Sequence, residues 1–123
     1  MGYLQPTMIP MPAPIVDLEM VVSYGSADES TVRLREGQST GEELDRQIAA
    51  LVETRPSKVT IDLGALPRVS SAGLGLMLTL RRNVADYAGE VKVASVSPTV
   101  GQLFRRTGLD VLFDVEGREV GVA

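Results

Sequence analysis

The stretch that decides the fold is "KVTIDLGALPRVSSAGLGLMLTLRRN", residues 58–83. In its first part every second residue is apolar from Val59 to Leu63, which predicts a short β-strand. A pair of serines, Ser70 and Ser71, then precedes an apolar run with helical spacing, and either hydroxyl can cap that helix. The stretch therefore predicts a strand, a loop and a helix, with two hydroxyls at the junction.

The helix expected after the serines has an apolar pattern that begins at Leu74. Its periodic positions are Leu74, Met77, Leu78 and Ala85. We expect it to run to about Ala88, with Gly89 as the stop. Gly73 and Gly75 each weaken a helix by roughly 1 kcal/mol relative to alanine, so tight packing or access must favour them.

The residues before this stretch predict a hairpin and a helix. "IVDLEMVVS", residues 15–23, and "TVRLREG", residues 31–37, predict two strands joined by a turn-rich loop as an antiparallel pair. "STGEELDRQIAALVETRP", residues 39–56, then changes to helical spacing. One face of this segment carries Leu44, Ile48, Leu51 and Val52. Thr40 and Glu43 have the spacing of a capping box, and the final proline forbids continuation of the helix.

The residues after it repeat the order of strand and helix. "EVKVASV", residues 90–96, predicts a strand, and "SPTVGQLFRRTGLDVLFDV" follows it. In this segment Ser97 is expected as N-cap, Pro98 at the first helical position and Gly108 as the stop. The inner positions of the helix are Val100, Leu103 and Phe104. A last short strand, residues 109–115, is expected to close the sheet.

The order of elements predicts the fold class. A strand, a helix and a second strand in succession imply a parallel crossover, whereas the first two strands form a hairpin. We therefore expect an α/β fold, with helices packed on a mixed, mainly parallel sheet and an antiparallel first hairpin. A chain of 123 residues has room for one such domain. We expect a flexible N-terminal arm over residues 1–14, the domain over 15–116 and a C-terminal tail over 117–123.

The composition excludes several classes of function. The chain has no cysteine and no histidine, which removes thiolate metal sites and histidine-based catalysis, so neither a metal nor a cofactor is expected. The net charge of −4 gives no support to nucleic-acid binding. The N-terminus lacks a basic region, and no segment approaches about 20 uninterrupted apolar residues. We therefore expect a cytoplasmic protein that does not insert into a membrane.

Enzymatic interpretations of the serine pair lack the residues that they need. A phosphate-binding loop of the nucleoside triphosphatase type requires a lysine that is absent here. A serine nucleophile requires a base, for which only Lys58 and Lys92 are candidates. We interpret Asp62 as a carboxylate that bonds loop amides, and Arg105 and Arg106 as complements to a helix dipole. No catalytic residue is expected.

The charge is distributed unevenly along the chain. Residues 67–106 hold six basic and two acidic residues, although the whole chain is acidic. This part of the chain presents either solvated helix faces or a surface that meets an acidic partner.

Taken together, residues 60–115 resemble the STAS family, the domain shared by sulphate transporters and bacterial anti-sigma factor antagonists. The resemblance extends over about residues 15–115 and is most specific in "IDLG", "SSAGLGLM" and "SPTVGQLFRRTGL". Small single-domain members resemble the antagonists of partner-switching systems. In those systems, an unphosphorylated antagonist binds an anti-sigma factor, a serine kinase of the histidine-kinase-like ATPase superfamily. Phosphorylation of one serine of the antagonist breaks this binding.

The resemblance implies a site at the serine pair. The family's loop usually reads Asp-Ser-(Ser/Thr/Ala)-Gly-Leu, with the phosphoacceptor directly after the aspartate. Alignment of the Gly-Leu pair puts Ser71 at the acceptor position and Ser70 in place of the aspartate, which leaves Ser70 as the second choice of acceptor. A further departure is "EGQSTGEEL", residues 36–44, where many antagonists carry a Gly-Glu-Leu-Asp-like stretch. The residues implied to contact the partner are Ser70, Ser71, Ala72, Gly73, Leu74 and Gly75.

The resemblance thus implies an anti-sigma factor antagonist and not an enzyme. Its partners would be the anti-sigma factor serine kinase, bound when Ser71 is unphosphorylated, and a serine phosphatase. A second possible function is that of a non-phosphorylated STAS subunit of an ATP-driven membrane lipid transport complex. A third is a serine-dependent enzyme.

Overall fold

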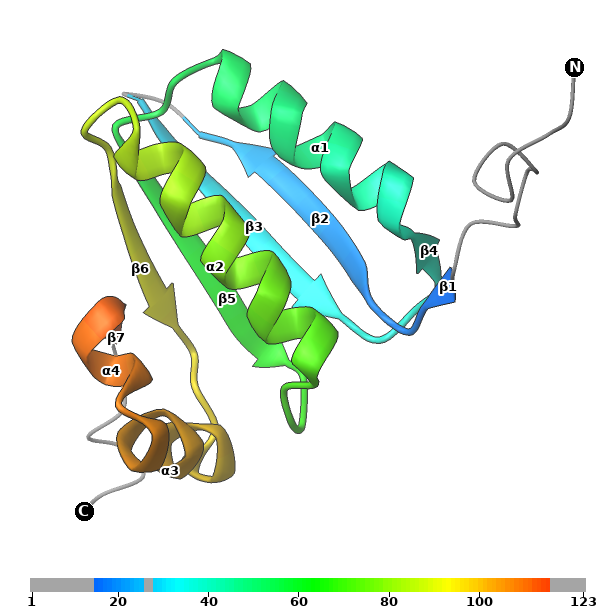
Figure 1. Cartoon of the computed structure of the whole chain (residues 1–123), viewed down its shortest axis with the longest axis vertical. Helices are drawn as coiled ribbons and strands as arrows, with labels where there is room; N and C mark the ends of the chain where they lie inside the picture. The colour runs from blue at the N-terminus through cyan, green and yellow to red at the C-terminus, as the bar shows by residue number, and fades with distance from the viewer. Residues whose placement is uncertain (1–14, 26–27, 116–123) are drawn as a thin grey trace, which may run out of the picture.

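The computed structural model, which describes residues 15–25 and 28–115, is built on a five-stranded sheet (Figure 1). The strand order is β2-β3-β5-β6-β7, and β2 and β3 form an antiparallel hairpin while the later neighbours are parallel. The bounds are β2 Glu19–Tyr24, β3 Glu29–Arg35, β5 Lys58–Ala65, β6 Glu90–Ala94 and β7 Asp114–Val115. The sheet confirms the predicted α/β fold, mixed and mainly parallel with an antiparallel first hairpin.

A short strand pair leads into the first helix. β1 (Ile15–Val16) pairs antiparallel with β4 (Ser39–Thr40), directly before α1 (Gly41–Glu53). The predicted capping box is confirmed, because Thr40 Oγ1 accepts from the Glu43 amide at 3.1 Å and Glu43 Oε1 accepts from the Thr40 amide at 2.8 Å. The helix ends three residues before Pro56, as the proline predicts.

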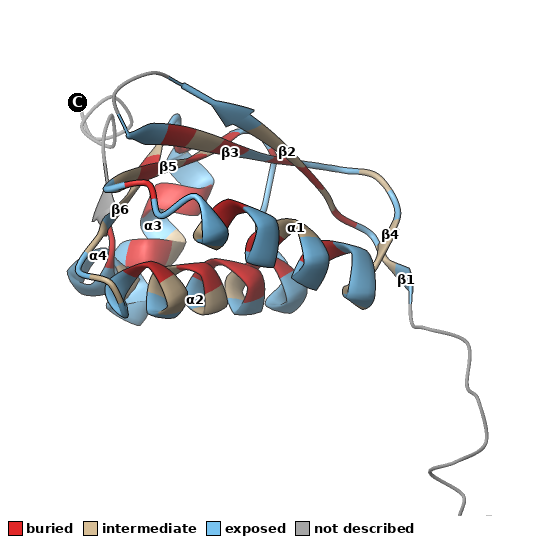
Figure 2. Cartoon of the chain, turned by 90° about the horizontal axis from the view of Figure 1, so that it is seen from above, coloured by how far each residue is buried: buried red, intermediate tan, exposed pale blue. Residues whose placement is uncertain are grey.

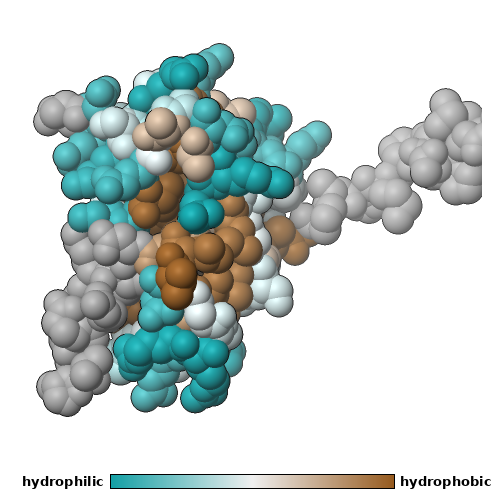
Figure 3. Space-filling model, turned by 60° about the vertical axis from the view of Figure 1, so that its left-hand side comes forward, coloured by the Kyte–Doolittle hydropathy of each residue, from teal (hydrophilic) through white to brown (hydrophobic). Residues whose placement is uncertain are grey.

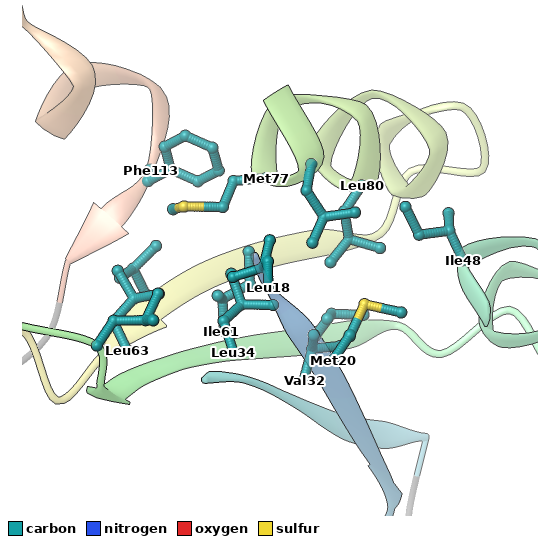
Figure 4. Packing of buried hydrophobic residues seen from close by; sticks show 14 of the residues in the cluster. Leu18, Met20, Val32, Leu34, Ile48, Ile61, Leu63, Met77, Leu80 and Phe113 are labelled. Carbon is teal, nitrogen blue, oxygen red and sulfur yellow. The ribbon is translucent and has the colours of Figure 1, made fainter. Parts of the chain in front are cut away.

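Helix α1 and helix α2 (Ser71–Ala85) lie side by side on one face of the sheet, with their buried sides turned toward it (Figure 2). Along the strands, the residues that face the two helices are buried and alternate with residues that are not. In β3, for example, Ser30, Val32 and Leu34 are buried and the intervening residues are not. Figure 4 shows the resulting hydrophobic core between sheet and helices. Its labelled members are Leu18, Met20, Val32, Leu34, Ile48, Ile61, Leu63, Met77, Leu80 and Phe113.

The inner face of α2 differs from the prediction by one residue. Its buried residues are Gly73, Leu76, Met77, Leu80 and Val84, whereas Leu78 and Ala85 are exposed. A shift of one residue rotates a helix face by about 100°. The run "LGLMLTL" is apolar at both sets of positions, so the sheet, and not the pattern, selects which set is buried.

Helix α2 also ends earlier than predicted, at Ala85 instead of Ala88. The chain closes with Ala88 in the left-handed conformation at φ 67° and with the Gly89 amide donating to the Val84 carbonyl at 2.9 Å. A Cβ on Gly89 would lie 2.6 Å from Val84 Cγ1. Gly89 is therefore required for space, while the left-handed position falls on an alanine.

Helix α3 (Pro98–Thr107) begins and ends as predicted, and Figure 1 shows it beside the carboxyl end of β6. Ser97 Oγ accepts from the Val100 amide at 3.2 Å, and Gly108 takes the left-handed conformation at φ 79°. Val100 and Phe104 are buried, while Leu103 is only half-buried.

The predicted last strand, residues 109–115, is wrong over its first part. Residues Leu109–Leu112 form the single-turn helix α4, and only Asp114–Val115 pair with β6. The turn brings Phe113 into the core, where its ring centroid lies 6.2 Å from that of Phe104, and leaves Val111 84% exposed. In place of a strand pairing, the Val111 amide donates to the Gly108 carbonyl at 3.1 Å and the Phe113 amide to the Leu109 carbonyl at 3.0 Å.

The predicted arm over residues 1–14 and tail over 117–123 lie outside the described residues. Within the described ranges, no helix is both long and apolar enough to cross a bilayer.

Candidate functional site

The predicted site lies in the loop between the carboxyl end of β5 and the start of α2. The loop begins with a turn in which the Leu66 amide donates to the Leu63 carbonyl at 3.1 Å. Asp62 Oδ1 accepts from the Gly64 amide at 2.8 Å, which confirms that this carboxylate bonds a loop amide. Leu66 is buried and Val69 half-buried, so both ends of the loop are held against the core.

The two serines have different positions in the structure. Ser70 is the N-cap of α2, with extended backbone at φ −84° and ψ 171°, and its Oγ accepts from the Gly73 amide at 3.2 Å. Ser71 is the first residue of the helix, and its side chain is exposed. Among the described residues, the Ser71 hydroxyl has no hydrogen-bond partner. Either serine could have capped the helix, and the structure assigns the cap to Ser70.

The start of α2 is an electropositive helix end. The Gly73 and Leu74 amides are bonded to the Ser70 side chain and carbonyl, at 3.2 and 2.9 Å. The amides of Ser71 and Ala72 have no acceptor within the described part of the chain. Because free amides and the helix dipole both favour negative charge, a phosphate fits this end of the helix better than its carboxyl end.

The six residues predicted to contact a partner divide by exposure. Ser70, Ser71, Ala72 and Gly75 are exposed, while Gly73 is buried and Leu74 half-buried. A Cβ on Gly73 would lie 3.1 Å from Val69 Cγ1, so this glycine allows the loop to pack closely. A Cβ on Gly75 would meet nothing within 4 Å, which leaves a bare surface one helical turn beyond Ser71.

Neither candidate base is near the serines along the sheet. Lys58 begins β5, while the serines follow the opposite end of this eight-residue strand, which spans about 25 Å. Lys92 pairs with Thr60 in the parallel register of β5 and β6, two residues from that same starting end. In this register neither lysine is placed beside the serines as a base.

A groove of about 290 Å³ lies beside the loop. Arg68 and Val69 line one side, and Val100, Leu103 and Arg106 of α3 line the other. A larger hollow of about 730 Å³ lies between β2 and α1, away from the serines. Among its charged lining residues, Arg35 Nε lies 2.6 Å from Glu19 Oε1 and Glu43 belongs to the capping box. The smaller groove is the one that adjoins the serine loop.

Exposed apolar side chains lie further along α2 and on α4. Leu78 is 41% exposed and Leu112 40%, and Arg81 Nε donates to the Leu112 carbonyl at 2.8 Å, which joins the two helices. Figure 3, with the α4 side turned forward, shows hydrophobic side chains gathered between hydrophilic upper and lower parts of the surface. Apolar surface of this kind is typical of a protein that binds another protein.

The opposite end of α2 is closed by Tyr87. Its hydroxyl donates to the Pro56 carbonyl at 2.8 Å, and the Arg55 guanidinium lies 5.1 Å from its ring centroid. Burial raises the pKa of Tyr87, while the charge of Arg55 opposes this shift.

Within the described part of the chain, no group of three or more acidic side chains is placed to hold a metal ion.

Comparisons with known proteins agree with this geometry. The family model of the STAS domain matches residues 11–119. BtrV of Bordetella bronchiseptica, described as an anti-sigma factor antagonist, is 31% identical over 86 residues, which cover 69% of this chain and 74% of BtrV.

Solved structures show the same fold. An anti-sigma factor antagonist from Mycobacterium paratuberculosis superposes with a TM-score of 0.64 at 23% identity, over 89% of this chain and 91% of that one. Unphosphorylated SpoIIAA gives 0.61 at 19% identity, over 85% and 93%. Phosphorylated SpoIIAA from Bacillus gives 0.59 at 19% identity, over 85% and 96%. The chain therefore belongs to the STAS domain family and is of the anti-sigma factor antagonist type.

Proposed function

We propose that this protein is a cytoplasmic, non-enzymatic antagonist whose binding to an anti-sigma factor is switched by phosphorylation of Ser71. The unphosphorylated protein binds an anti-sigma factor that is a serine kinase of the histidine-kinase-like ATPase superfamily. Phosphate on Ser71 releases this partner, and a serine phosphatase restores binding. The observation that carries the proposal is that Ser70 caps α2, whereas the side chain of Ser71 is exposed and is not used by the cap.

Ser71 suits a phosphoacceptor better than Ser70 for a structural reason. A kinase that modified Ser70 would alter the oxygen that accepts from the Gly73 amide, and loss of an N-cap costs about 1 kcal/mol. The Ser71 hydroxyl is exposed and supports no described hydrogen bond, so its modification leaves the cap in place.

The same position explains how a phosphate would act on the interface and not on the fold. A phosphoserine carries about −1.5 to −2 charges, which the start of a helix tolerates. A partner packed over Ser71, Ala72 and Gly75 would instead have to accommodate a dianion at the contact. Desolvation and repulsion there cost a few kcal/mol, which changes Kd by orders of magnitude.

The missing aspartate changes charge more than it changes structure. Where the family's loop usually has aspartate, this chain has Ser70, and serine and aspartate are comparable N-caps. The substitution therefore keeps the cap and removes one negative charge next to the acceptor. We expect it to affect which kinase recognises the loop, and to leave the start of α2 unchanged.

The relatives support the proposed antagonist function, and the choice of Ser71 as phosphoacceptor rests on the two serines themselves. BtrV is described as an anti-sigma factor antagonist, and SpoIIAA has been solved in an unphosphorylated and a phosphorylated form. The exposed apolar side chains on α2 and α4 supply surface for a protein partner on the helix that begins with Ser71.

The test is affinity capture from the lysate of the native host, with captured proteins identified by mass spectrometry. The baits are the wild type, Ser71→Asp and its neutral isostere Ser71→Asn. We expect the wild type and Ser71→Asn to hold an ATPase of the histidine-kinase-like type. Ser71→Asp should weaken its binding roughly a hundredfold.

The result that would overturn the switch is equal capture of this ATPase by all three baits. Recovery of the same transporter subunits on all three baits would instead assign the protein to a membrane transport complex. The melting temperature of Ser71→Asp serves as the control. It should not fall, because an acidic side chain in the first turn of a helix is favourable by about 0.3–1 kcal/mol.

A further inference from the structure

The groove beside the serine loop has an apolar interior and a basic rim. Of its apolar lining residues, Val100 is buried, while Val69 and Leu103 are half-buried. Arg68 and Arg106 are exposed and come from the two elements that line the groove, the loop and α3. The two remaining lining residues also come from α3 and are uncharged, so no acidic side chain lines the groove. We call it the Arg68–Arg106 groove.

Neither arginine of this groove is neutralised within the described part of the chain. The ion pair found there joins Arg35 of β3 to Glu19 of β2, and neither residue lines the groove. Asp110 of α4 (Leu109–Leu112) is the acidic residue nearest in sequence to Arg106, and among the described residues no ion pair joins it to either arginine. Two unpaired guanidinium groups across an apolar groove favour a ligand that brings a carboxylate between them.

The groove and the proposed switch lie on the same loop. Arg68 and Val69 directly precede Ser70, which caps α2, and Arg68 is three residues from Ser71. Along α3 the groove extends from its first turn to Arg106, which is about 9–10 Å of helix axis. This length accommodates a few residues of a bound segment, too few for a whole interface but enough for one anchor within it.

We propose that the Arg68–Arg106 groove anchors an acidic segment of the anti-sigma partner, in which a glutamate or aspartate is flanked by apolar side chains. The carboxylate lies between the two arginines, and the flanking side chains contact Val69 and Leu103. This inference rests on the proposed function, because the occupant is the partner that Ser71 controls. The groove lies within residues 67–106, where basic residues outnumber acidic ones, and this local charge favours an acidic partner.

The chain offers a matched control, since Arg105 and Arg106 are adjacent, both exposed and both in the last turn of α3. Only Arg106 lines the groove. The experiment measures the Kd of the ATPase captured by the wild type for full-length protein carrying Arg68→Gln, Arg106→Gln or Arg105→Gln, together with each melting temperature. We expect Arg68→Gln and Arg106→Gln to weaken binding about tenfold each, and Arg105→Gln to change it less than about twofold. Arg105→Gln and Arg106→Gln should lower the melting temperature equally and by no more than a few degrees, because both charges complement the dipole of α3, and Arg68→Gln should melt like the wild type.

A charge reversal identifies the occupant. Arg106→Glu should abolish binding, and replacement of the contacting acidic residue of the ATPase by arginine should restore it. The groove proposal is overturned if Arg106→Gln binds as tightly as Arg105→Gln while Ser71→Asp still releases the ATPase. In that case the proposed function stands. If the wild type holds no such ATPase, the proposed function itself fails.

The groove could also bind a second copy of this chain in place of the ATPase. Sedimentation velocity of the wild type and Arg106→Gln decides this point. We expect both to sediment as the same species, whereas a dimer that Arg106→Gln dissociates would overturn the proposal and assign the groove to self-association.

Discussion

Helices α2 and α3 begin with the same cap and differ at the next residue. Ser70 Oγ accepts from the Gly73 amide and Ser97 Oγ from the Val100 amide, each at 3.2 Å. The residue that follows the cap is Ser71 in α2 and Pro98 in α3. Proline at this position only prepares the backbone for the helix, whereas serine adds an exposed hydroxyl that the cap does not use. The comparison separates a serine that builds a helix end from a serine available for modification.

Substitution of the third residue of each helix should have the largest effect on the free energy of unfolding. Val100 is buried, whereas its counterpart Gly73 packs against Val69. Val100→Gly removes a core side chain and adds helix flexibility, so we expect a loss of about 3 kcal/mol in the free energy of unfolding. Gly73→Val should cost about 1–3 kcal/mol through overpacking. Urea unfolding measures both, and tolerance of valine at Gly73 would show that α2 does not need a close approach there.

The two caps should be worth the same. Ser70→Ala and Ser97→Ala should each lower the free energy of unfolding by about 1 kcal/mol, because each removes the acceptor of one amide. Ser71→Ala should change it by less than about 0.5 kcal/mol, since this side chain is exposed. Chemical denaturation of the three variants checks this order. A larger loss for Ser71→Ala than for Ser70→Ala would reverse the assignment of the cap.

The smallest expected effect is a pH-dependent change in stability at Tyr87, which follows the carboxyl end of α2. Burial raises the folded-state pKa of Tyr87, so its neutral form contributes stability that is fully present below the unfolded pKa of about 10. This contribution is lost as pH rises through the folded pKa. Between about pH 9 and about pH 11 the wild type should therefore lose more stability than Tyr87→Phe. Equal losses would mean that burial does not raise the pKa of Tyr87 in the folded state.

The features that the sequence predicts well are those set by local chemistry. The capping box of Thr40 and Glu43 has a spacing that serves one purpose, and the order of Ser97, Pro98 and Gly108 marks both ends of α3. The hairpin and the parallel crossovers follow from the order of elements. These features need only neighbours in sequence, or general rules of handedness, to be determined.

The features that the sequence does not predict are set by packing. The buried stripe of α2 is one residue from the predicted one, because leucines occupy both stripes and contact with the sheet selects between them. The segment from Leu109 to Phe113 is rich in apolar residues, which fits a short strand, yet a turn is what brings Phe113 against Phe104. The choice between Ser70 and Ser71 as cap likewise depends on where the helix starts. The Arg68–Arg106 groove joins residues more than thirty positions apart, which no local pattern indicates.

The measurement that tests the central claim most directly is the position of the phosphate. The captured ATPase is incubated with ATP and the wild type, Ser70→Ala or Ser71→Ala, and the phosphorylated peptide is sequenced by tandem mass spectrometry. The account predicts phosphate on Ser71 in the wild type and in Ser70→Ala, and none in the loop of Ser71→Ala. Phosphate on Ser70, or continued phosphorylation of the loop in Ser71→Ala, would contradict the account.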